Sequence, residues 1–186
     1  MSKTEILSEA GSHMDKTVKA LAHEFSTVRT GRASGAVLDN IQIDYYGTPT
    51  PITQLAGVKT PEAQLLVIEP WDKSVLSAIE KAIQSSDLGI TPSNDGSVIR
   101  LPFPQLNEER RKDLVKQCKH YGEESRVAVR NIRRDANAKL DRIEKAGDIS
   151  EDERDDGKDE VQKLTDLHVH EIDEALKRKE AEIMEV

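Results

Sequence analysis

The feature that most constrains the fold is an apolar repeat with helical spacing that runs through residues 107–146. Its inner positions recur every three, four or seven residues and are Leu114, Cys118, Tyr121, Ser125, Ala128, Ile132, Ala136 and Ile143. This spacing is typical of one face of an amphipathic helix. At 1.5 Å per residue the helix would be about 60 Å long. A single rod is therefore expected to dominate a chain of 186 residues.

Two further segments, residues 4–29 and 150–184, carry the same helical spacing. The inner positions of the first are Leu7, Ala10, Met14, Val18, Leu21, Phe25 and Val28, and those of the second are Val161, Leu164, His168, Ile172, Leu176 and Ile183. Asn107 is a suitable N-cap and Gly147 a suitable terminator for the middle helix. The segment from Ser150 to Glu153 has the form of a capping box. The sequence therefore predicts three long helices.

The period changes between the first long helix and the second. Runs rich in Val, Ile, Leu and Tyr predict short strands at 37–52, 63–69 and 98–103, with a turn at 46–49 and a short helix at 72–86. We therefore expect an α+β protein. Its helical domain would comprise residues 1–30 plus 105–186, and residues 31–104 would form an inserted β/α/β domain.

Two adjacent connectors join the expected domains, one at residues 30–35 and one at residues 101–106. The first is rich in small residues and the second is stiffened by proline. Together they predict a double hinge that limits the directions of domain movement. The candidate hinge residues are Gly31, Arg32, Ser34, Gly35, Pro102 and Pro104.

Charge is distributed unevenly along a chain whose net charge is −8. Residues 107–147 hold twelve basic and eight acidic groups, net +4, whereas residues 148–186 hold six and fifteen, net −9. In the basic segment, arginines at i, i+4, i+7 and i+8 share one helix face: Arg126, Arg130, Arg133 and Arg134. Like charges repel, and a guanidinium donates paired hydrogen bonds to phosphate. The stripe therefore predicts a contact with nucleic acid.

The plainer alternative for this stripe is a solvated face whose arginines pair with acids. Glu123 is the nearest local acid, so the stripe finds few partners at helical spacing. For Arg134, an acidic side chain of the predicted third helix is a second candidate partner. Arg110 and Arg111 lie beside three acidic residues, and local pairing is as plausible for them as an RNA contact. Arg29 also suits the negative end of the first helix.

Composition argues against several classes of protein. Aromatic residues make up only 3% of the chain, which disfavours a stacking platform for single strands. The single cysteine, Cys118, cannot form an internal disulfide or build a zinc site alone, which fits a reducing cytoplasm. No apolar run is long enough for a membrane span and no signal peptide begins the sequence. A soluble, cytoplasmic protein is expected.

Motifs for nucleotide binding, metal binding and catalysis are also lacking. The segment from Gly31 to Gly35 does not have the Gly-Lys-Ser/Thr ending of a phosphate-binding loop. His168 and His170 are two residues apart on a helix and point about 200° away from each other, which disfavours a shared metal ion. No serine or cysteine lies in a nucleophile elbow. We therefore expect no cofactor, no metal and no enzymatic activity.

Five motifs follow one another along the chain: Arg29–Ser34, Tyr45–Pro49, Ser86–Gly89, Glu108–Leu114 and Val127–Arg134. In order and spacing they resemble the signatures of bacterial ribosome recycling factors. The resemblance extends from about residue 4 to the C-terminus. One departure is Asn107, which occupies a cap position where threonine is usual, and both residues cap helices well.

The resemblance implies an L-shaped monomer in which a three-helix bundle carries a β/α/β domain at a hinge. Family members split the post-termination ribosome into subunits together with elongation factor G and GTP. The bundle would bind large-subunit ribosomal RNA, where family members use arginines that match Arg29, Arg130 and Arg133. The inserted domain would face elongation factor G, which is the partner that uses GTP.

Two other classes are weighed against this interpretation. A structural or adaptor protein that pairs with a coiled-coil partner would continue its inner stripe onto an outward apolar face, but the outward faces here are charged. A hydrolase is a distant third class, because no motif recommends one. The RNA interpretation requires arginines that point outward, and it fails if carboxylates of residues 148–186 neutralise them.

Overall fold

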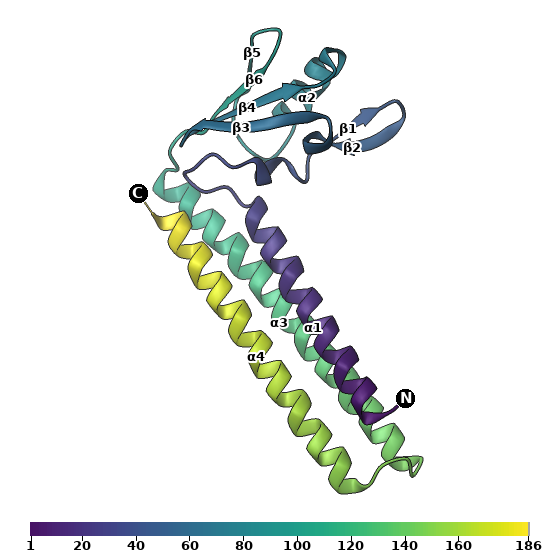
Figure 1. The fold of residues 1–186 in the computed structure, drawn as a ribbon. Coiled ribbons are helices and arrows are strands. Elements are labelled where there is room, and N and C mark those ends of the chain that lie inside the picture. The colour runs from purple at the N-terminus through teal and green to yellow at the C-terminus, as the bar shows by residue number, and fades with distance from the viewer. Residues whose placement is uncertain (186) are drawn as a thin grey trace. The chain divides into compact units, whose positions relative to one another are not determined.

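The computed structural model describes residues 1–185, which divide into two compact units. The first contains Met1–Phe25 and Lys116–Glu180, and the second contains Ser26–Val115 together with the residues from Ala181 on. The colours in Figure 1 show that each unit combines segments far apart in the sequence. Each unit also has its own hydrophobic core.

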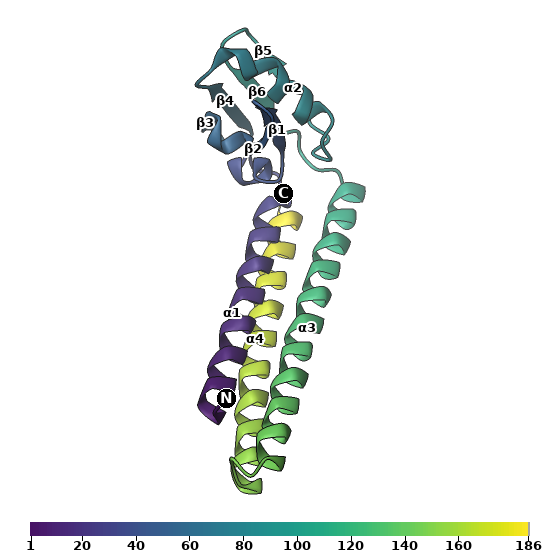
Figure 2. The same ribbon diagram turned by 90° about the vertical axis from the view of Figure 1, so that its right-hand side faces the viewer.

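Three long helices confirm the predicted helical bundle. They are α1 (Lys3–Thr27), α3 (Glu108–Lys145) and α4 (Glu151–Met184), and their ends agree with the predicted spans to within two residues. Within the first unit the three helices lie side by side in both ribbon views (Figure 1, Figure 2). No helix among the described residues is both long and apolar enough to cross a membrane.

Local signals set the helix ends as predicted. The side-chain oxygen of Asn107 accepts a hydrogen bond from the amide of Arg110 at 2.7 Å. Gly147 follows α3 with a φ of 81°, and its amide and the next one donate back to carbonyls of the last turn, which is a Schellman motif. Ser150 and Glu153 exchange side-chain and backbone hydrogen bonds of 2.8 and 3.1 Å, so the predicted capping box is confirmed.

The buried face of α3 is rotated relative to the predicted stripe. Val129 and Leu140 are fully buried, whereas Tyr121, Ser125 and Ile132 are only partly buried. The cause is that α3 contacts both α1 and α4, so its buried face is set by two neighbours rather than by one apolar row. The rotation moves the core towards the arginine stripe.

A buried glycine allows two of the helices to approach closely. Gly157 lies in α4, and a Cβ at this position would be 3.0 Å from Cδ2 of Leu140 on α3. The sequence alone suggests only that a glycine weakens a helix interior. The structure shows that the absent side chain makes room for Leu140.

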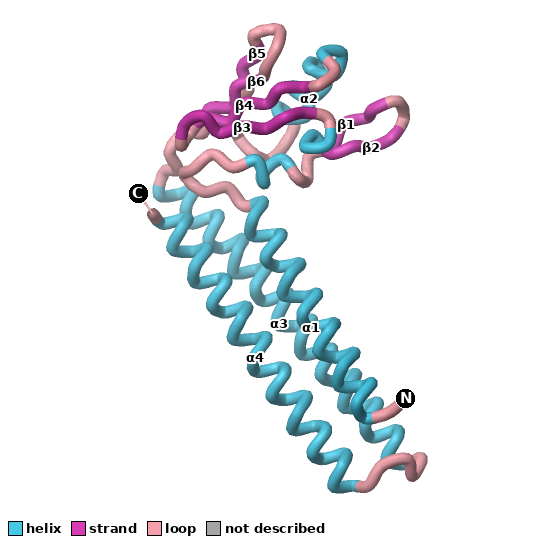
Figure 3. The backbone as a smooth tube through the Cα atoms, in the orientation of Figure 1, coloured by secondary structure: helices cyan, strands magenta, loops and turns pink. Residues whose placement is uncertain are grey.

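The second unit contains a four-stranded antiparallel sheet in the order β3-β4-β6-β5, drawn in magenta in Figure 3. Its strands are β3 (Ala56–Glu62), β4 (Leu65–Pro70), β6 (Ile99–Pro102) and β5 (Ser93–Asn94). A separate hairpin pairs β1 (Gln42–Tyr45) with β2 (Thr48–Pro51). Helix α2 (Leu76–Gln84) packs its apolar side into the same core. Strands before and after one helix fit the predicted inserted domain.

One strand prediction needs correction, and two strands of the sheet were not predicted. The predicted strand at 37–52 is a 3-10 turn, Gly35–Leu38, followed by the β1–β2 hairpin. The hairpin turn is where the sequence predicts it, and Tyr46 and Gly47 both have positive φ, 50° and 83°, as a tight two-residue turn requires. The sequence does not predict β3, whose apolar run is interrupted by glycine and proline. The two residues of β5 are too few to form a pattern.

Candidate nucleic-acid interface

The four arginines of the predicted stripe on α3 extend from the edge of the bundle core towards solvent. Val129, which is fully buried, lies one helical turn from both Arg126 and Arg133. The side chain of Arg126 is 20% exposed and that of Arg130 is 43% exposed, while Arg134 is an exposed residue. The predicted common face is therefore present, but its members differ in their access to solvent.

Arg126 is bound within the protein. Its Nε and Nη2 atoms lie 2.8 and 2.6 Å from Oδ1 of Asp173 on α4, and its Nη1 lies 3.1 Å from Oε2 of Glu123. Burial acts to lower the pKa of Arg126, but the hydrogen bonds and charges of these two carboxylates outweigh burial and raise it. For this arginine, the C-terminal acidic segment does supply a neutralising carboxylate.

The other three arginines of the stripe are less compensated. Nη1 of Arg130 lies 3.4 Å from Glu123, which also contacts Arg126. Nη1 of Arg133 donates to the neutral side chain of Gln162 at 3.3 Å. Within residues 1–185, neither Arg133 nor Arg134 forms an ion pair. These side chains therefore keep positive charge that an external anion can use.

The second unit contains a separate cationic feature around Arg29. This residue is 7% exposed, and among the described residues no carboxylate pairs with it. Its guanidinium lies 5.7 Å from the ring centre of Phe103 and donates to the carbonyl of Pro104, while its Nε is buried without a hydrogen-bond partner. Burial, and next the charge of Arg110, lower the pKa of Arg29. A desolvated cation beside a like charge is stabilised by an anion.

Local pairing does not neutralise Arg110 and Arg111. Glu108 pairs instead with Lys112 at 3.1 Å, and neither arginine has an ion-pair partner in the part of the chain that the structure describes. Nε of Arg111 is buried without a hydrogen-bond partner. Together with Arg29, these residues form a set of cations that have no counter-ion within residues 1–185.

The candidate hinge residues fall into two groups. Oγ of Ser34 caps the 3-10 turn by accepting a 3.3 Å hydrogen bond from the amide of Ala36, and Pro102 ends β6. A Cβ on Gly35 would lie 3.1 Å from Val58, so Gly35 packs closely within the folded domain. These three residues are therefore held by contacts within the sheet domain, and they are poor candidates for hinge residues.

The remaining candidate hinge residues are less constrained. A Cβ on Gly31 would meet no atom within 4 Å. Arg32 is exposed and lies 3.9 Å from Glu185 in a weak ion pair. Pro104 accepts the hydrogen bond from Arg29. Open space is thus present around Gly31, and the backbone amide of Arg32 donates a 3.4 Å hydrogen bond to Oγ1 of Thr30.

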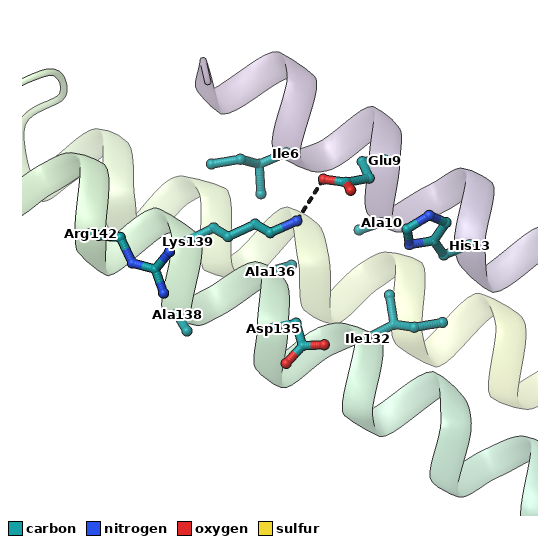
Figure 4. Close-up of a pocket in the computed structure, with 10 residues that line it drawn as sticks. All are labelled: Ile6, Glu9, Ala10, His13, Ile132, Asp135, Ala136, Ala138, Lys139 and Arg142. Atoms are coloured by element: carbon teal, nitrogen blue, oxygen red, sulfur yellow. Dashed lines mark hydrogen bonds and ion pairs between the residues drawn. The ribbon is translucent and has the colours of Figure 1, made fainter.

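A shallow groove of about 220 Å³ lies between α1 and α3 (Figure 4). Its floor is apolar, and Lys139 crosses it to contact Glu9 at 2.7 Å. Asp135 and Arg142 also line it. Its two acidic and two basic side chains balance, and His13 is the other titratable lining residue, so the groove lacks the excess of arginine found on the stripe.

His168 forms a buried link between α4 and α1 rather than a metal site. It is 3% exposed, its Nδ1 lies 2.6 Å from the carbonyl oxygen of Leu164, and its Nε2 lies 2.7 Å from Oδ1 of Asp15. Both ring nitrogens face acceptors, so the doubly protonated imidazolium satisfies the site best. Among the described residues, no cluster of three or more possible ligands could hold a metal ion.

We expect the stability of the bundle to fall as pH rises above 6.5. Burial acts to lower the pKa of His168, but the hydrogen bonds to Asp15 and to the Leu164 carbonyl raise it above the ordinary histidine value of 6.5. The stabilisation is complete below the pKa of the unfolded chain and is lost as pH rises through the folded pKa. Thermal unfolding from pH 5.5 to pH 8.5 measures this effect, with His168→Gln as the control that should flatten the dependence. An NMR titration that places the His168 pKa at or below 6.5 would contradict the prediction.

A three-helix bundle with an arginine-bearing face on α3, together with a small sheet domain, defines the class of protein to which this chain belongs. The sequence profile of the ribosome recycling factor family matches residues 21–184, and the chain is a member of that family. It is 58% identical over 182 residues to the ribosome-recycling factor of Geobacillus sp. (strain WCH70) and 55% identical to that of Bacillus mycoides (strain KBAB4), with 98% of each chain covered.

Solved structures agree with this assignment. A solution structure of the ribosome recycling factor is 41% identical, with a TM-score of 0.77 and coverage of 100% of this chain and 99% of that one. The T. thermophilus ribosome recycling factor, described with E. coli elongation factor G bound to the E. coli post-termination complex, is 44% identical over the whole of both chains, with a TM-score of 0.69. The predicted family and fold class are confirmed.

Proposed function

We propose that this chain binds the post-termination ribosome and, with elongation factor G and GTP, promotes its separation into subunits. Family membership and the likeness to the factor bound beside elongation factor G support this function. The chain acts as a translation factor without enzymatic activity and without a cofactor, because elongation factor G consumes the GTP. Its place of action is the cytoplasm, and it works as a monomer.

The proposed contact with the ribosome is large-subunit ribosomal RNA. Seven arginines would form it: Arg29, Arg110, Arg111, Arg126, Arg130, Arg133 and Arg134. The single observation that carries this proposal is that an acidic protein leaves most of these guanidiniums without carboxylate partners within residues 1–185. Phosphates along an RNA backbone would supply the missing anions.

The arginines would contribute in different ways. Arg133 and Arg134 carry uncompensated charge at the bundle surface, so they are suited to direct phosphate contacts. Arg126 is already paired with Asp173 and Glu123, so it would contribute the least to phosphate binding. Arg29 is preorganised against Phe103 and needs little reordering to bind an anion.

We assign residues 1–30 plus 105–186 to the ribosome-binding bundle and residues 31–104 to the domain that faces elongation factor G. In this mechanism the bundle holds ribosomal RNA while elongation factor G pushes on the inserted domain. The long, capped helices resist bending, so a push at the hinge becomes a displacement between subunits. GTP hydrolysis by elongation factor G would supply the free energy.

Light scattering by post-termination ribosomes tests the proposed function directly. Scattering should fall when this chain, elongation factor G and GTP are all present, because separated subunits scatter less light than intact ribosomes. Omission of any one of the three should leave the signal high. Scattering that stays at its initial level when the chain, elongation factor G and GTP are all present would refute the function.

Restricting the backbone at Gly31 should separate binding from splitting. Gly31→Val adds a branched side chain that limits backbone rotation in a place where a Cβ has open space. We expect unchanged co-sedimentation with ribosomes but slower splitting in the light-scattering assay. Gly31→Ala is the milder control. If Gly31→Val splits ribosomes at the wild-type rate, rotation at this residue is unnecessary.

The adaptor alternative receives no support from the bundle surface. On the helices of the first unit, the exposed large apolar side chains are Val127 on α3 and Leu167 on α4, and two isolated residues do not form a docking stripe. A coiled-coil partner needs a continuous apolar seam. A sedimentation measurement that shows a monomer together with salt-sensitive ribosome binding would separate the two classes.

A further inference from the structure

Four side chains on α3 and α4 form a line of alternating charge. Asp173 on α4 binds Arg126 at 2.6 Å, Arg126 binds one carboxylate oxygen of Glu123 at 3.1 Å, and the other oxygen of Glu123 lies 3.4 Å from Nη1 of Arg130. Each of the two middle groups therefore has an oppositely charged neighbour on both sides. The line ends at Arg130, whose side chain is 43% exposed.

We infer that Glu123 occupies the guanidinium of Arg130 in the free protein and competes there with RNA phosphate. This inference rests on the proposed function, because it concerns the same arginine surface. A carboxylate and a phosphate oxygen present the same kind of acceptor to a guanidinium. Glu123 therefore acts as an internal stand-in for phosphate, and it must give up Arg130 when RNA binds.

The position of Glu123 is fixed by the bundle rather than by Arg130. Arg126 holds its Oε2 atom at 3.1 Å, and Arg126 is itself anchored by two contacts to Asp173 across the α3–α4 interface. The Arg126 side chain is only 20% exposed, whereas those of Glu123 and Arg130 are 56% and 43% exposed. The anchored contact is thus the inner one, and the contact with Arg130 is the one that phosphate can displace.

The strength of the outer contact suits a competitor that can be displaced. An exposed ion pair contributes only a small stabilisation, because water and salt screen it. Its loss on RNA binding therefore reduces affinity by a modest factor, on the order of two- to five-fold for a typical surface pair. The carboxylate also cancels part of the charge that Arg130 brings to the phosphates, so it reduces the salt dependence of binding.

Glu123→Gln tests this inference because it removes the charge and keeps a side-chain oxygen for Arg126. The matched control is Glu124→Gln, which changes net charge equally but lies about 100° around the helix and pairs with His120 at 2.8 Å. We would measure co-sedimentation with large ribosomal subunits over a series of KCl concentrations. Glu123→Gln should bind about two- to five-fold more tightly than wild type, with a log–log salt slope steeper by up to about 0.9. Glu124→Gln should match wild type in slope.

The outcomes separate this inference from the proposed function. Wild-type protein that shows no salt-sensitive binding to the subunits would refute the RNA-binding proposal itself. If wild type binds but the two variants have the same affinity and slope, only net charge matters and Glu123 is not a competitor. Weaker binding by Glu123→Gln, at an unchanged melting temperature, would show that Glu123 aids Arg130 instead of competing for it.

Discussion

Replacement of Arg133 by alanine is expected to weaken ribosome binding by about 1–3 kcal/mol, the range for hydrogen bonds to a charged group. Arg133 forms no ion pair within residues 1–185 and donates only to Gln162, at 3.3 Å. Its loss should therefore leave the melting temperature nearly unchanged. The salt slope of binding should also become shallower by about 0.9, because one phosphate contact is lost. Co-sedimentation with ribosomes at several salt concentrations measures both quantities.

Arg142→Ala is a matched control for Arg133→Ala. Arg142 is exposed on the same helix, nine residues further along and so about 180° around it, where it lines the groove between α1 and α3. The Arg142→Ala substitution therefore removes the same charge as Arg133→Ala, but from the opposite face of α3. Equal weakening by both variants would mean that net charge, and not the arginine face, determines binding. Wild-type affinity of Arg133→Ala at moderate salt would remove Arg133 from the site.

Leu140→Ala is expected to lower the free energy of unfolding by about 2–5 kcal/mol, as for other large-to-small changes in protein cores. Leu140 is fully buried, and its two methyl groups fill the space beside Gly157, where a Cβ would lie 3.0 and 3.1 Å away. Gly157→Ala would add this Cβ in the wild-type protein and overpack the α3–α4 interface, which costs about 1–3 kcal/mol. The better helix propensity of alanine offsets about 1 kcal/mol of this cost.

The sign of Gly157→Ala should therefore depend on Leu140. In the wild type it should be neutral to destabilising, and in the Leu140→Ala background it should stabilise, because the added methyl then fills vacated space. Gly11→Ala is the control, since the nearest atom to its Cβ, on Leu164, is at an ordinary 3.9 Å, and it should stabilise α1 by about 1 kcal/mol. Urea unfolding monitored by far-ultraviolet circular dichroism measures the free energy of unfolding of all four variants. The same sign in both backgrounds would contradict the packing argument.

The helices could be predicted because their signals are local. Asn107, Gly147 and the Ser150–Glu153 box each act within one turn of their own position, so no knowledge of the rest of the fold is needed. Apolar spacing also located the three long helices. The short strands were harder, because β3 includes Gly57 and Pro61 and depends on its neighbour β4 for its hydrogen bonds.

The electrostatics of the arginine face could not be predicted from spacing along α3. The partner of Arg126 is Asp173, which is 47 residues away in the sequence, and the partner of Arg133 is Gln162 on the same helix as Asp173. Neither α4 residue belongs to a recognisable motif. Their contacts depend on how α4 is rotated against α3, a rotation that also placed Val129 in the core. The sequence identified the cations, and tertiary packing determines which of them remain available.

The origin of the bundle from both ends of the chain has a consequence for its biosynthesis. Ile6 and Ala10 of α1 are buried against Ala136, Leu140 and Val161, all of which belong to the last third of the polypeptide. Translation proceeds from the N-terminus, so the apolar face of α1 has no packing partner until nearly the whole chain has left the exit tunnel.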